Sequence, residues 1–445
     1  MPNKVAFNEA YPVVTGSDGL YERALPIMTP VTQTLAKGPG QYINGVAPKY
    51  LKRGKGARVW DVDGNEFLDY NMAIGPLSLG YCYPRVDEAI IAQLKDGITF
   101  SMMHELEVVL AELIHDIIPN AEAIRISKTG ADVTSAAVRV ARAFTGRKKV
   151  LCCGYHGWHD WYISVTSRSS GIPQEVRDLT STFGYNDIDS VKNALDEDTA
   201  CVILEPFVFE APRHNFLQEL KDLCEANGTL LIFDEMWTGF RIALGGAQEF
   251  FGVTPDLACY SKAFANGMPI SLLTGRKEVM DLFKEEVFFF TTFGGEALSL
   301  AAAVATIQEM KEKNVAAYLA EKGKRIKDGY NMLAAELGIA HYTGCTGYDC
   351  RSLVSFDAVA GNPLELKSFV QQEMLRRGVL WSGFHNMSFS HTDEEVNYTL
   401  AAYREVLGLL KEAVTRQEVA SLLRGAPIEP VFRKVSNFNT KPVTK

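Results

Sequence analysis

Three short segments with chemically useful side chains each follow a β-rich run of four or five residues. They are Asp234-Glu235, Lys262 and Thr129-Gly130-Ala131-Asp132. Because such runs have the length of buried strands, each segment is predicted to lie at the end of a strand. The third also precedes a helical pattern, so its backbone N–H groups can bind an anion. The separation 262 − 234 = 28 residues spans one strand–helix–strand unit.

A lysine, an acid and an anion site together match the needs of pyridoxal phosphate (PLP). The cofactor needs an amine for a Schiff base, a carboxylate at its ring nitrogen and a site for its phosphate. Taken singly, each segment also has an ordinary explanation: a solvated loop lysine, a surface acid pair or metal ligands, and a helix cap. Their order on alternating elements favours the cofactor.

The elements that must position these groups alternate between residues 97 and 320. This alternation predicts an α/β fold with a parallel or mostly parallel sheet covered on both faces. Ligands of such sheets bind at the carboxyl ends of the strands. The predicted strands are residues 123–126, 149–153, 201–205, 230–234, 257–260 and 270–273, and three predicted helices are residues 133–144, 188–195 and 216–226.

Three segments make up the predicted domain organisation. Residues 1–96 form an extended N-terminal arm and part of a small domain, residues 97–320 the large domain, and residues 321–445 a C-terminal α+β domain. Asp63-Gly64-Asn65 predicts a hairpin turn within residues 57–70. In the C-terminal segment we expect helices at 321–337 and 364–377 and strands at 352–357 and 387–390. We expect the two chain ends to join in the smaller domain.

Composition excludes several classes of protein. The net charge of 45 − 54 = −9 argues against a nucleic-acid binder. The start of the chain has no apolar run typical of a signal peptide, and no run approaches the ~20 residues of a membrane span. The eight cysteines are scattered, several within apolar runs, which is typical of cytoplasmic proteins. Cys345 and Cys350 lack further ligands, so no metal site is predicted.

Several ordered motifs give a resemblance between about residues 20 and 410. The chain resembles the class III pyridoxal-phosphate aminotransferases of fold type I, within their glutamate-1-semialdehyde aminomutase-like branch. The resemblance implies a large domain with a mostly parallel seven-stranded sheet, plus a smaller α+β domain from both chain ends. The matching segments are residues 60–66, 129–132, 154–157, 205–206, 234–241, 261–267 and 291–294.

The resemblance implies a role for individual residues. Lys262 would carry the cofactor as a Schiff base and then move the substrate proton, and Asp234 would pair with the ring nitrogen. Tyr155 and Met236 would pack on opposite ring faces, and Thr292 would reach the phosphate of a neighbouring subunit in a homodimer. The remaining cofactor-binding residues would be Thr129, Gly130 and Ala131 at the phosphate, Glu205 near the ring hydroxyl, and His156 beside Tyr155.

Departures from the family pattern bear on the substrate. Ala131 removes one hydroxyl contact to the phosphate, worth ~1 kcal/mol. Residues 30–37 hold no arginine for a substrate carboxylate, and residues 382–387 lack the glutamate of true aminomutases. Both losses count against the aminomutase reaction.

The resulting prediction is an aminotransferase that moves an amino group from an amino-acid donor to a ketone or aldehyde. Neutral polar side chains at Gln33, His385 and Asn386 would suit a hydroxylated or sugar-like acceptor, with Trp158 at the entrance. These side chains are equally compatible with solvent or a dimer interface. Rival functions are an aminomutase or epimerase, a decarboxylase, and a non-catalytic protein that keeps the fold. A nicotinamide dehydrogenase would need a G-x-G-x-x-G after a strand, and we find none.

Overall fold

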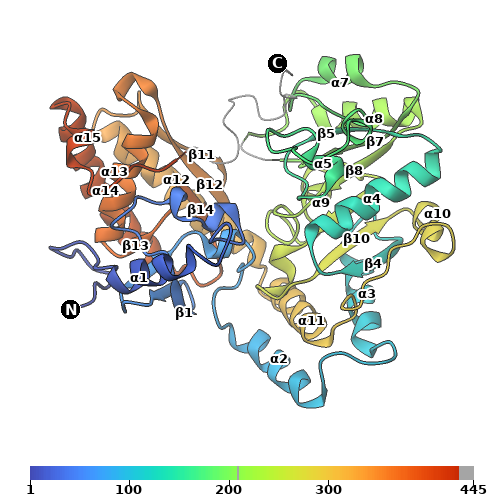
Figure 1. Cartoon of the computed structure of the whole chain (residues 1–445), viewed down its shortest axis with the longest axis horizontal. Helices are drawn as coiled ribbons and strands as arrows, with labels where there is room; N and C mark the ends of the chain where they lie inside the picture. Colours follow the sequence, from blue (N-terminus) through green and yellow to red (C-terminus); the bar gives the residue numbers. More distant parts are fainter. Residues whose placement is uncertain (208–209, 430–445) are drawn as a thin grey trace. The chain divides into compact units, whose positions relative to one another are not determined.

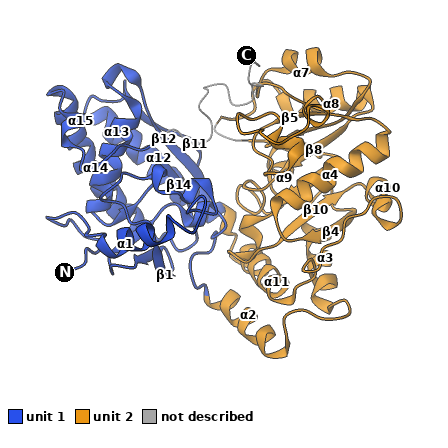
Figure 2. Cartoon of the chain, viewed as in Figure 1, with its two compact units in different colours: residues 1–83, 317–434 blue, residues 84–316, 435–445 orange. Residues whose placement is uncertain are grey.

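The computed structural model describes residues 1–207 and 210–429 of the chain (Figure 1). Two compact units divide these residues (Figure 2). Unit 1 contains residues 1–83 and the C-terminal part from residue 317, and unit 2 contains residues 84–316. Residues 1–83 and the described residues from 317 onward therefore share one unit. The units change at residues 83 and 316, whereas the sequence placed its domain boundaries at 96 and 320.

The described part of unit 2 contains a seven-stranded sheet in the order β4-β10-β9-β8-β7-β5-β6. Strands β9, β8, β7, β5 and β6 are parallel to one another, and β10 is antiparallel to both of its neighbours. The predicted mostly parallel sheet is thus confirmed. Its strands are β4 (Ala123–Ser127), β5 (Lys149–Cys153), β6 (Thr180–Thr182), β7 (Thr199–Leu204), β8 (Leu230–Asp234), β9 (Leu257–Tyr260) and β10 (Ser271–Gly275).

Helices follow most strands of this sheet. Every residue of β7, β8 and β9 is buried, which requires cover on both sheet faces. The described helices of unit 2 are α2 (Pro84–Asp96), α3 (Glu105–Ile117), α4 (Gly130–Thr145), α5 (Asp160–Ile163), α6 (Gln174–Arg177), α7 (Ile188–Ala194), α8 (Phe216–Asn227), α9 (Ala247–Phe251), α10 (Lys277–Met280) and α11 (Ala297–Glu312). Helix α12 (Val315–Glu336) begins at the boundary with unit 1.

Unit 1 is a smaller α+β body. The predicted hairpin is present: β2 and β3 pair antiparallel around Gly64, whose φ of +88° suits the turn. The described strands and helices are α1 (Thr15–Ala24), β1 (Leu51–Lys55), β2 (Arg58–Asp61), β3 (Glu66–Asp69), β11 (Thr343–Tyr348), β12 (Arg351–Phe356), α13 (Pro363–Arg376), β13 (Val379–Leu380), β14 (Phe384–Asn386), α14 (Asp393–Thr415) and α15 (Val419–Leu422).

Two expectations for unit 1 were wrong. The arm expected to be extended contains helix α1, whose sequence has few apolar residues to announce it. The strand expected at 387–390 instead lies earlier, at β14, where Asn386 pairs with Arg351 of β12. Ser388 is already turning, because its backbone N–H donates to His391 Nδ1 (3.0 Å).

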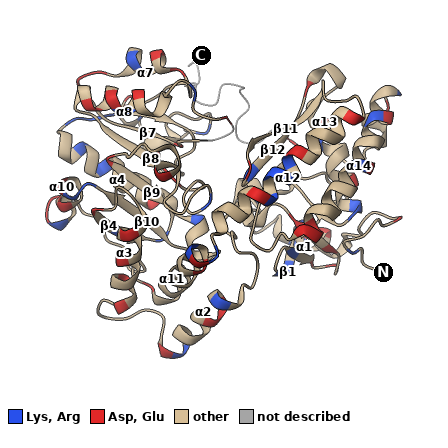
Figure 3. Ribbon diagram, turned by 180° about the vertical axis from the view of Figure 1, so that it is seen from behind, with Lys and Arg blue, Asp and Glu red and all other residues tan. Residues whose placement is uncertain are grey.

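Charged residues of both signs are interspersed on the ribbon of each unit (Figure 3). This pattern fits the modest negative charge of the whole chain. Among the residues that the structure describes, no helix combines the length and the apolar character needed to cross a bilayer.

Candidate active site

The start of helix α4 forms the first part of the site. Asp132 N donates to Thr129 Oγ1 (3.3 Å), and Thr129 N donates to Asp132 Oδ2 (2.8 Å), so the two residues form a capping box. Ser127 Oγ also donates to this carboxylate (3.0 Å). The N–H groups of Gly130 and Ala131 have no hydrogen-bond partner among the described residues. A helix start with two such groups is an anion site.

A buried carboxylate–imidazole pair forms the second part. Asp234 is the last residue of β8, and its Oδ2 accepts a hydrogen bond from His156 Nδ1 (2.7 Å). Both side chains are fully buried. Asp234 Oδ1 also accepts from Met236 N (3.1 Å). The ring of Trp161 stacks beside His156, with centroids 6.1 Å apart and planes at 13°. His156 Nε2 is buried with no partner in the described part of the chain.

The loop after β5 carries this histidine against the start of α4. Thr134 Oγ1 donates to the carbonyl of His156 (2.8 Å). A Cβ on Gly157 would lie 2.8 Å from the Cβ of Ala131, and Gly157 has a φ of +105°. Only glycine meets both demands without strain. The close approach therefore joins the anion site to the carboxylate–imidazole pair.

Two further predicted residues border this loop. Glu205 follows β7, and its Oε2 accepts from Tyr155 N (2.8 Å), so it holds the backbone that carries Tyr155. Tyr155 is 45% exposed and therefore accessible to a ligand. Met236 follows β8 and packs against the start of α4, since a Cβ added to Gly130 would lie 2.7 Å from the Met236 sulfur. The packing of Tyr155 and Met236 on opposite faces of a cofactor ring stays a prediction.

Lys262 follows β9, the strand next to β8. In the parallel register Asp234 lies opposite Cys259, and Glu235 N donates to the Cys259 carbonyl (2.9 Å). The lysine comes three residues later, at the same edge of the sheet. It is partly buried and has a φ of +56°, a strained value for a residue with a Cβ. Backbone strain of this kind concentrates at functional sites.

Glu235 is a fully buried neighbour of Asp234. Burial raises the pKa of the Glu235 carboxyl to about 7, although hydrogen bonds from Ala247 N (2.8 Å), Thr238 Oγ1 and Gln248 N (3.0 Å) lower it. These bonds tie the segment after β8 to the start of α9. Glu235 therefore stabilises the turn that holds Asp234.

Thr292 lies in an exposed segment that packs on β4. Lys128 Nζ and Glu296 Oε2 form an ion pair (2.8 Å), and a Cβ on Gly294 would lie 3.3 Å from the Ile126 carbonyl. Phe288, Phe290 and Phe293 are each more than half exposed. Contiguous exposed aromatic side chains favour an interface with another chain.

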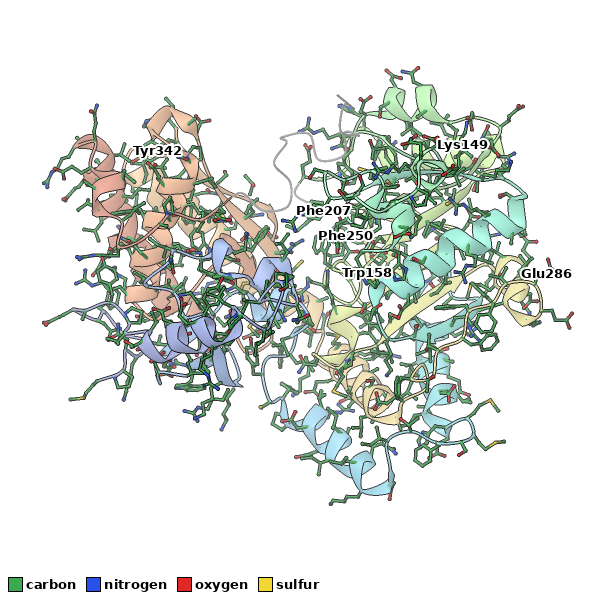
Figure 4. The ribbon with its side chains drawn as sticks, viewed as in Figure 1. Lys149, Trp158, Phe207, Phe250, Glu286 and Tyr342 are labelled. Atoms are coloured by element: carbon green, nitrogen blue, oxygen red, sulfur yellow. The ribbon has the colours of Figure 1, made fainter. Side chains whose placement is uncertain are left out.

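The four predicted substrate residues divide between the units. Gln33 is exposed in unit 1, and Trp158 is exposed in unit 2, on the loop after β5 (Figure 4). His385 is buried in unit 1, with Nδ1 2.9 Å from Ser352 Oγ and Nε2 2.6 Å from the Tyr403 hydroxyl. Burial lowers its pKa to about 3.

Asn386 is also buried, and its Nδ2 donates to the Asn71 carbonyl (3.1 Å). The contacts of His385 and Asn386 lie inside unit 1, and neither side chain faces solvent. A role for these four residues in substrate binding stays a prediction.

The residues of unit 2 fit a phosphorylated pyridine aldehyde. The anion site suits a phosphate, Asp234 suits a protonated ring nitrogen, and Tyr155 and Met236 suit the ring faces. Sequence reasoning missed Thr134 and Trp161, which fix His156. The positions of Thr134 and Trp161 in the sequence do not indicate these contacts with His156.

Comparison with known proteins agrees with this geometry. Residues 43–347 match the family model described as aminotransferase class-III. The chain belongs to the class III aminotransferases. It is 35% identical to the 3-aminobutyryl-CoA aminotransferase of Cloacimonas acidaminovorans, over 84% of this chain and 92% of the relative. It is 34% identical to a glutamate-1-semialdehyde 2,1-aminomutase of Exiguobacterium sp., over 89% of this chain and 98% of the relative.

Solved structures give the same result. One neighbour is the FumI protein of Sphingopyxis sp. MTA144, solved in its PLP internal aldimine form. It is 30% identical to this chain with a TM-score of 0.83, and the match covers 92% of this chain and 98% of the FumI chain. An omega-transaminase of Sphaerobacter thermophilus is 26% identical with a TM-score of 0.80, covering 89% and 98%. The predicted fold class, the aminotransferase class of enzyme and the PLP cofactor are therefore confirmed.

Proposed function

We propose that this class III aminotransferase moves an amino group from an amino-acid donor to a ketone or aldehyde acceptor, with Lys262 and Asp234 as its catalytic residues. One observation carries the proposal. The N–H groups of Gly130 and Ala131, which have no partner in the part of the chain that the structure describes, lie beside the loop whose His156 binds Asp234, and Lys262 follows the adjacent strand. Each group that PLP requires thus comes from the same edge of one sheet.

The protein residues have distinct tasks in this proposal. Bound PLP supplies an aldehyde that condenses with amines and a ring that accepts electrons. Lys262 Nζ takes the proton from the substrate carbon and returns it. Asp234 keeps a proton on the ring nitrogen, and His156 holds the Asp234 carboxylate in place. Tyr155 and Met236 fix the ring plane.

Departures in the sequence support transfer over the aminomutase reaction. Residues 30–37 contain no arginine, and His385 stands in the segment where aminomutases are expected to have a glutamate. His385 makes two hydrogen bonds inside unit 1. The aminomutase stays as the second candidate, because several relatives at 32–38% identity carry that name.

Neutral polar residues support a hydroxylated acceptor. Gln33 is exposed and Trp158 is 70% exposed, so both are available to a ligand. Neither side chain carries a charge, which disfavours a dependence on a second carboxylate in the acceptor. We therefore propose a ketone or aldehyde with hydroxyl groups.

A donor-dependence assay on the holoenzyme tests the reaction. Without a donor, each acceptor should give no product, and with glutamate or alanine the visible absorbance of the cofactor should change and recover on addition of acceptor. An isomerised product without any donor would instead establish the aminomutase. Lys262→Ala should abolish turnover, whereas Lys192→Ala, an exposed lysine of α7, should leave it unchanged. Activity of Lys262→Ala near that of the wild type would refute the mechanism.

The exposed aromatic segment around Thr292 supports a homodimer. Phe288, Phe290 and Phe293 need cover from another chain. We propose that a second copy supplies this cover and that Thr292 reaches its cofactor phosphate. Light scattering of the holoenzyme should give twice the mass of the chain, and Phe290→Asp should shift the mass toward the monomer. A monomeric, fully active wild type would contradict this proposal.

The cysteines support a cytoplasmic location. All eight lie among the described residues, none of them forms a disulfide bond, and seven are buried. A reducing compartment keeps such thiols reduced. Fractionation of the native cells should recover the activity with cytoplasmic markers, and activity in an oxidising compartment would contradict the assignment.

A further inference from the structure

A pocket of about 300 Å³ lies between helix α4 and residues 159–161 at the start of α5, within unit 2. It is separate from the anion site at the start of that helix, because its α4 residues lie one to three turns further along. Its wall contains two basic residues, one acid, a serine–histidine pair and two apolar side chains. The lining residues are Ser135, Val138, Arg139, Arg142, His159, Asp160 and Trp161.

The two arginines of the pocket lack anionic partners. Arg139 Nη1 donates to the Phe288 carbonyl (2.8 Å), and Arg142 Nε donates to the Lys148 carbonyl (2.8 Å). Within residues 1–207 and 210–429, neither guanidinium forms an ion pair, and their other N–H groups have no partner. Arg142 is half-buried, and burial lowers the pKa of its guanidinium. Such a charge normally pairs with an anion.

His159 offers a third polar group to the same space. Trp161 Nε1 can only donate, so Ser135 Oγ accepts from it (3.0 Å). Ser135 Oγ also forms a hydrogen bond with His159 Nδ1, which lies 2.6 Å away and fixes the imidazole ring. His159 Nε2 has no partner in the described part of the chain, so this nitrogen is available to a ligand.

Asp160 adds a negative charge to a pocket that also holds two positively charged arginines. Its carboxylate is exposed and has no partner among the described residues, so it disfavours a dianion but suits an ammonium group. Val138 and Trp161 are buried and add apolar wall. We propose that this pocket binds a zwitterionic α-amino acid with a small apolar side chain. The carboxylate binds Arg139 and Arg142, and the ammonium group binds Asp160.

The inference does not depend on the proposed transfer reaction. A binding measurement on holoenzyme that has been reduced with borohydride excludes reaction at the active site, since its cofactor is then fixed to Lys262. The probe is 2-aminoisobutyrate, with isobutyrate and isopropylamine as analogues that lack one charged group. Calorimetry measures affinity, and the visible spectrum of unreduced holoenzyme reports any entry into the active site.

The expected result is saturable binding of 2-aminoisobutyrate to reduced holoenzyme, about tenfold or more tighter than isobutyrate and isopropylamine. Arg142→Gln and Arg139→Gln should each weaken it about tenfold. Asp160→Asn should weaken the amino acid while strengthening isobutyrate. Arg416→Gln, an exposed arginine at the end of α14, should change nothing.

Several outcomes would overturn the proposal. These are binding of inorganic phosphate tighter than the amino acid, equal binding of all three probes, and no effect of either pocket arginine. Loss of 2-aminoisobutyrate binding on reduction would place the ligand in the active site instead. If Arg142→Gln does not fold, the exposed Arg139→Gln and Asp160→Asn still decide the question.

Discussion

The hydrogen bond between His156 and Asp234 gives the sharpest test of the site. His156→Leu keeps the approximate volume of the side chain but removes the donor at Nδ1. The Asp234 Oδ2 atom, fully buried and 2.7 Å from that nitrogen, then loses its side-chain partner. Among the described residues, the carboxylate then keeps only the Met236 N–H, on its other oxygen.

The magnitude follows from the burial and the charge of the acceptor. A hydrogen bond to a charged group contributes about 1.5–3 kcal/mol, which corresponds to a roughly 10- to 140-fold change. In the proposed mechanism Asp234 holds the proton on the ring nitrogen, so we expect this loss in kcat more than in KM. Steady-state kinetics with a saturating donor, together with the cofactor dissociation constant, measure both effects.

His156→Asn is the matched control. The Asn Nδ2 atom can occupy the position of His Nδ1 and donate to Asp234, so this variant should recover most of the lost kcat. Equal losses in His156→Leu and His156→Asn would show that the imidazole acts only through its packing on Trp161. A kcat for His156→Leu within threefold of the wild type would refute the positioning role itself.

Three further predictions concern stability and the anion site. Gly157→Ala should cost about 1–3 kcal/mol of unfolding free energy, because of its φ of +105° and the contact with Ala131, and should weaken PLP binding; denaturant titration with and without PLP measures both. Glu235 has a raised pKa of about 7 against 4.5, so its contribution to stability falls as pH rises from 4.5 to 7, by about 3 kcal/mol. Glu235→Gln should flatten that part of the stability curve of the apoprotein, and an unchanged slope would contradict the assignment. Burial lowers the pKa of His391 to about 4, so its contribution is present above pH 6.5 and is lost as pH falls toward 4, again by about 3 kcal/mol. His391→Gln should show a shallower loss of unfolding free energy over this range.

The local pattern of apolar residues was sufficient to predict most strands of unit 2. The apolar runs at β5, β8 and β9 match the predicted bounds to the residue, because strands buried on both faces are continuous apolar runs. β6 was missed because Thr180–Thr182 is short and polar, and it forms the edge of the sheet. Helix α1 was missed because two glycines and few apolar residues hide its periodicity.

The positions of Lys262, Asp234 and Thr129 at strand ends were also accessible from the sequence, since each lies within three residues of the end of a predicted strand. Their chemical surroundings were not. His156 reaches Asp234 across 78 positions of sequence, and Thr134 reaches the backbone of His156 across 22. No spacing rule joins such pairs, because the contacts arise only when β5 and β8 flank β7 in one sheet and α4 packs on it.

The same reasoning explains why the sequence could not show whether His385 is available to a ligand. In the sequence it is one of several neutral polar residues near a motif, and only burial shows that both ring nitrogens are used inside unit 1. A residue type therefore predicts what a side chain can do, whereas the number of its hydrogen-bonding atoms left without partners shows what it is available to do. By that measure Arg142 and His159, which no motif singles out as ligands, have more capacity for a ligand than His385.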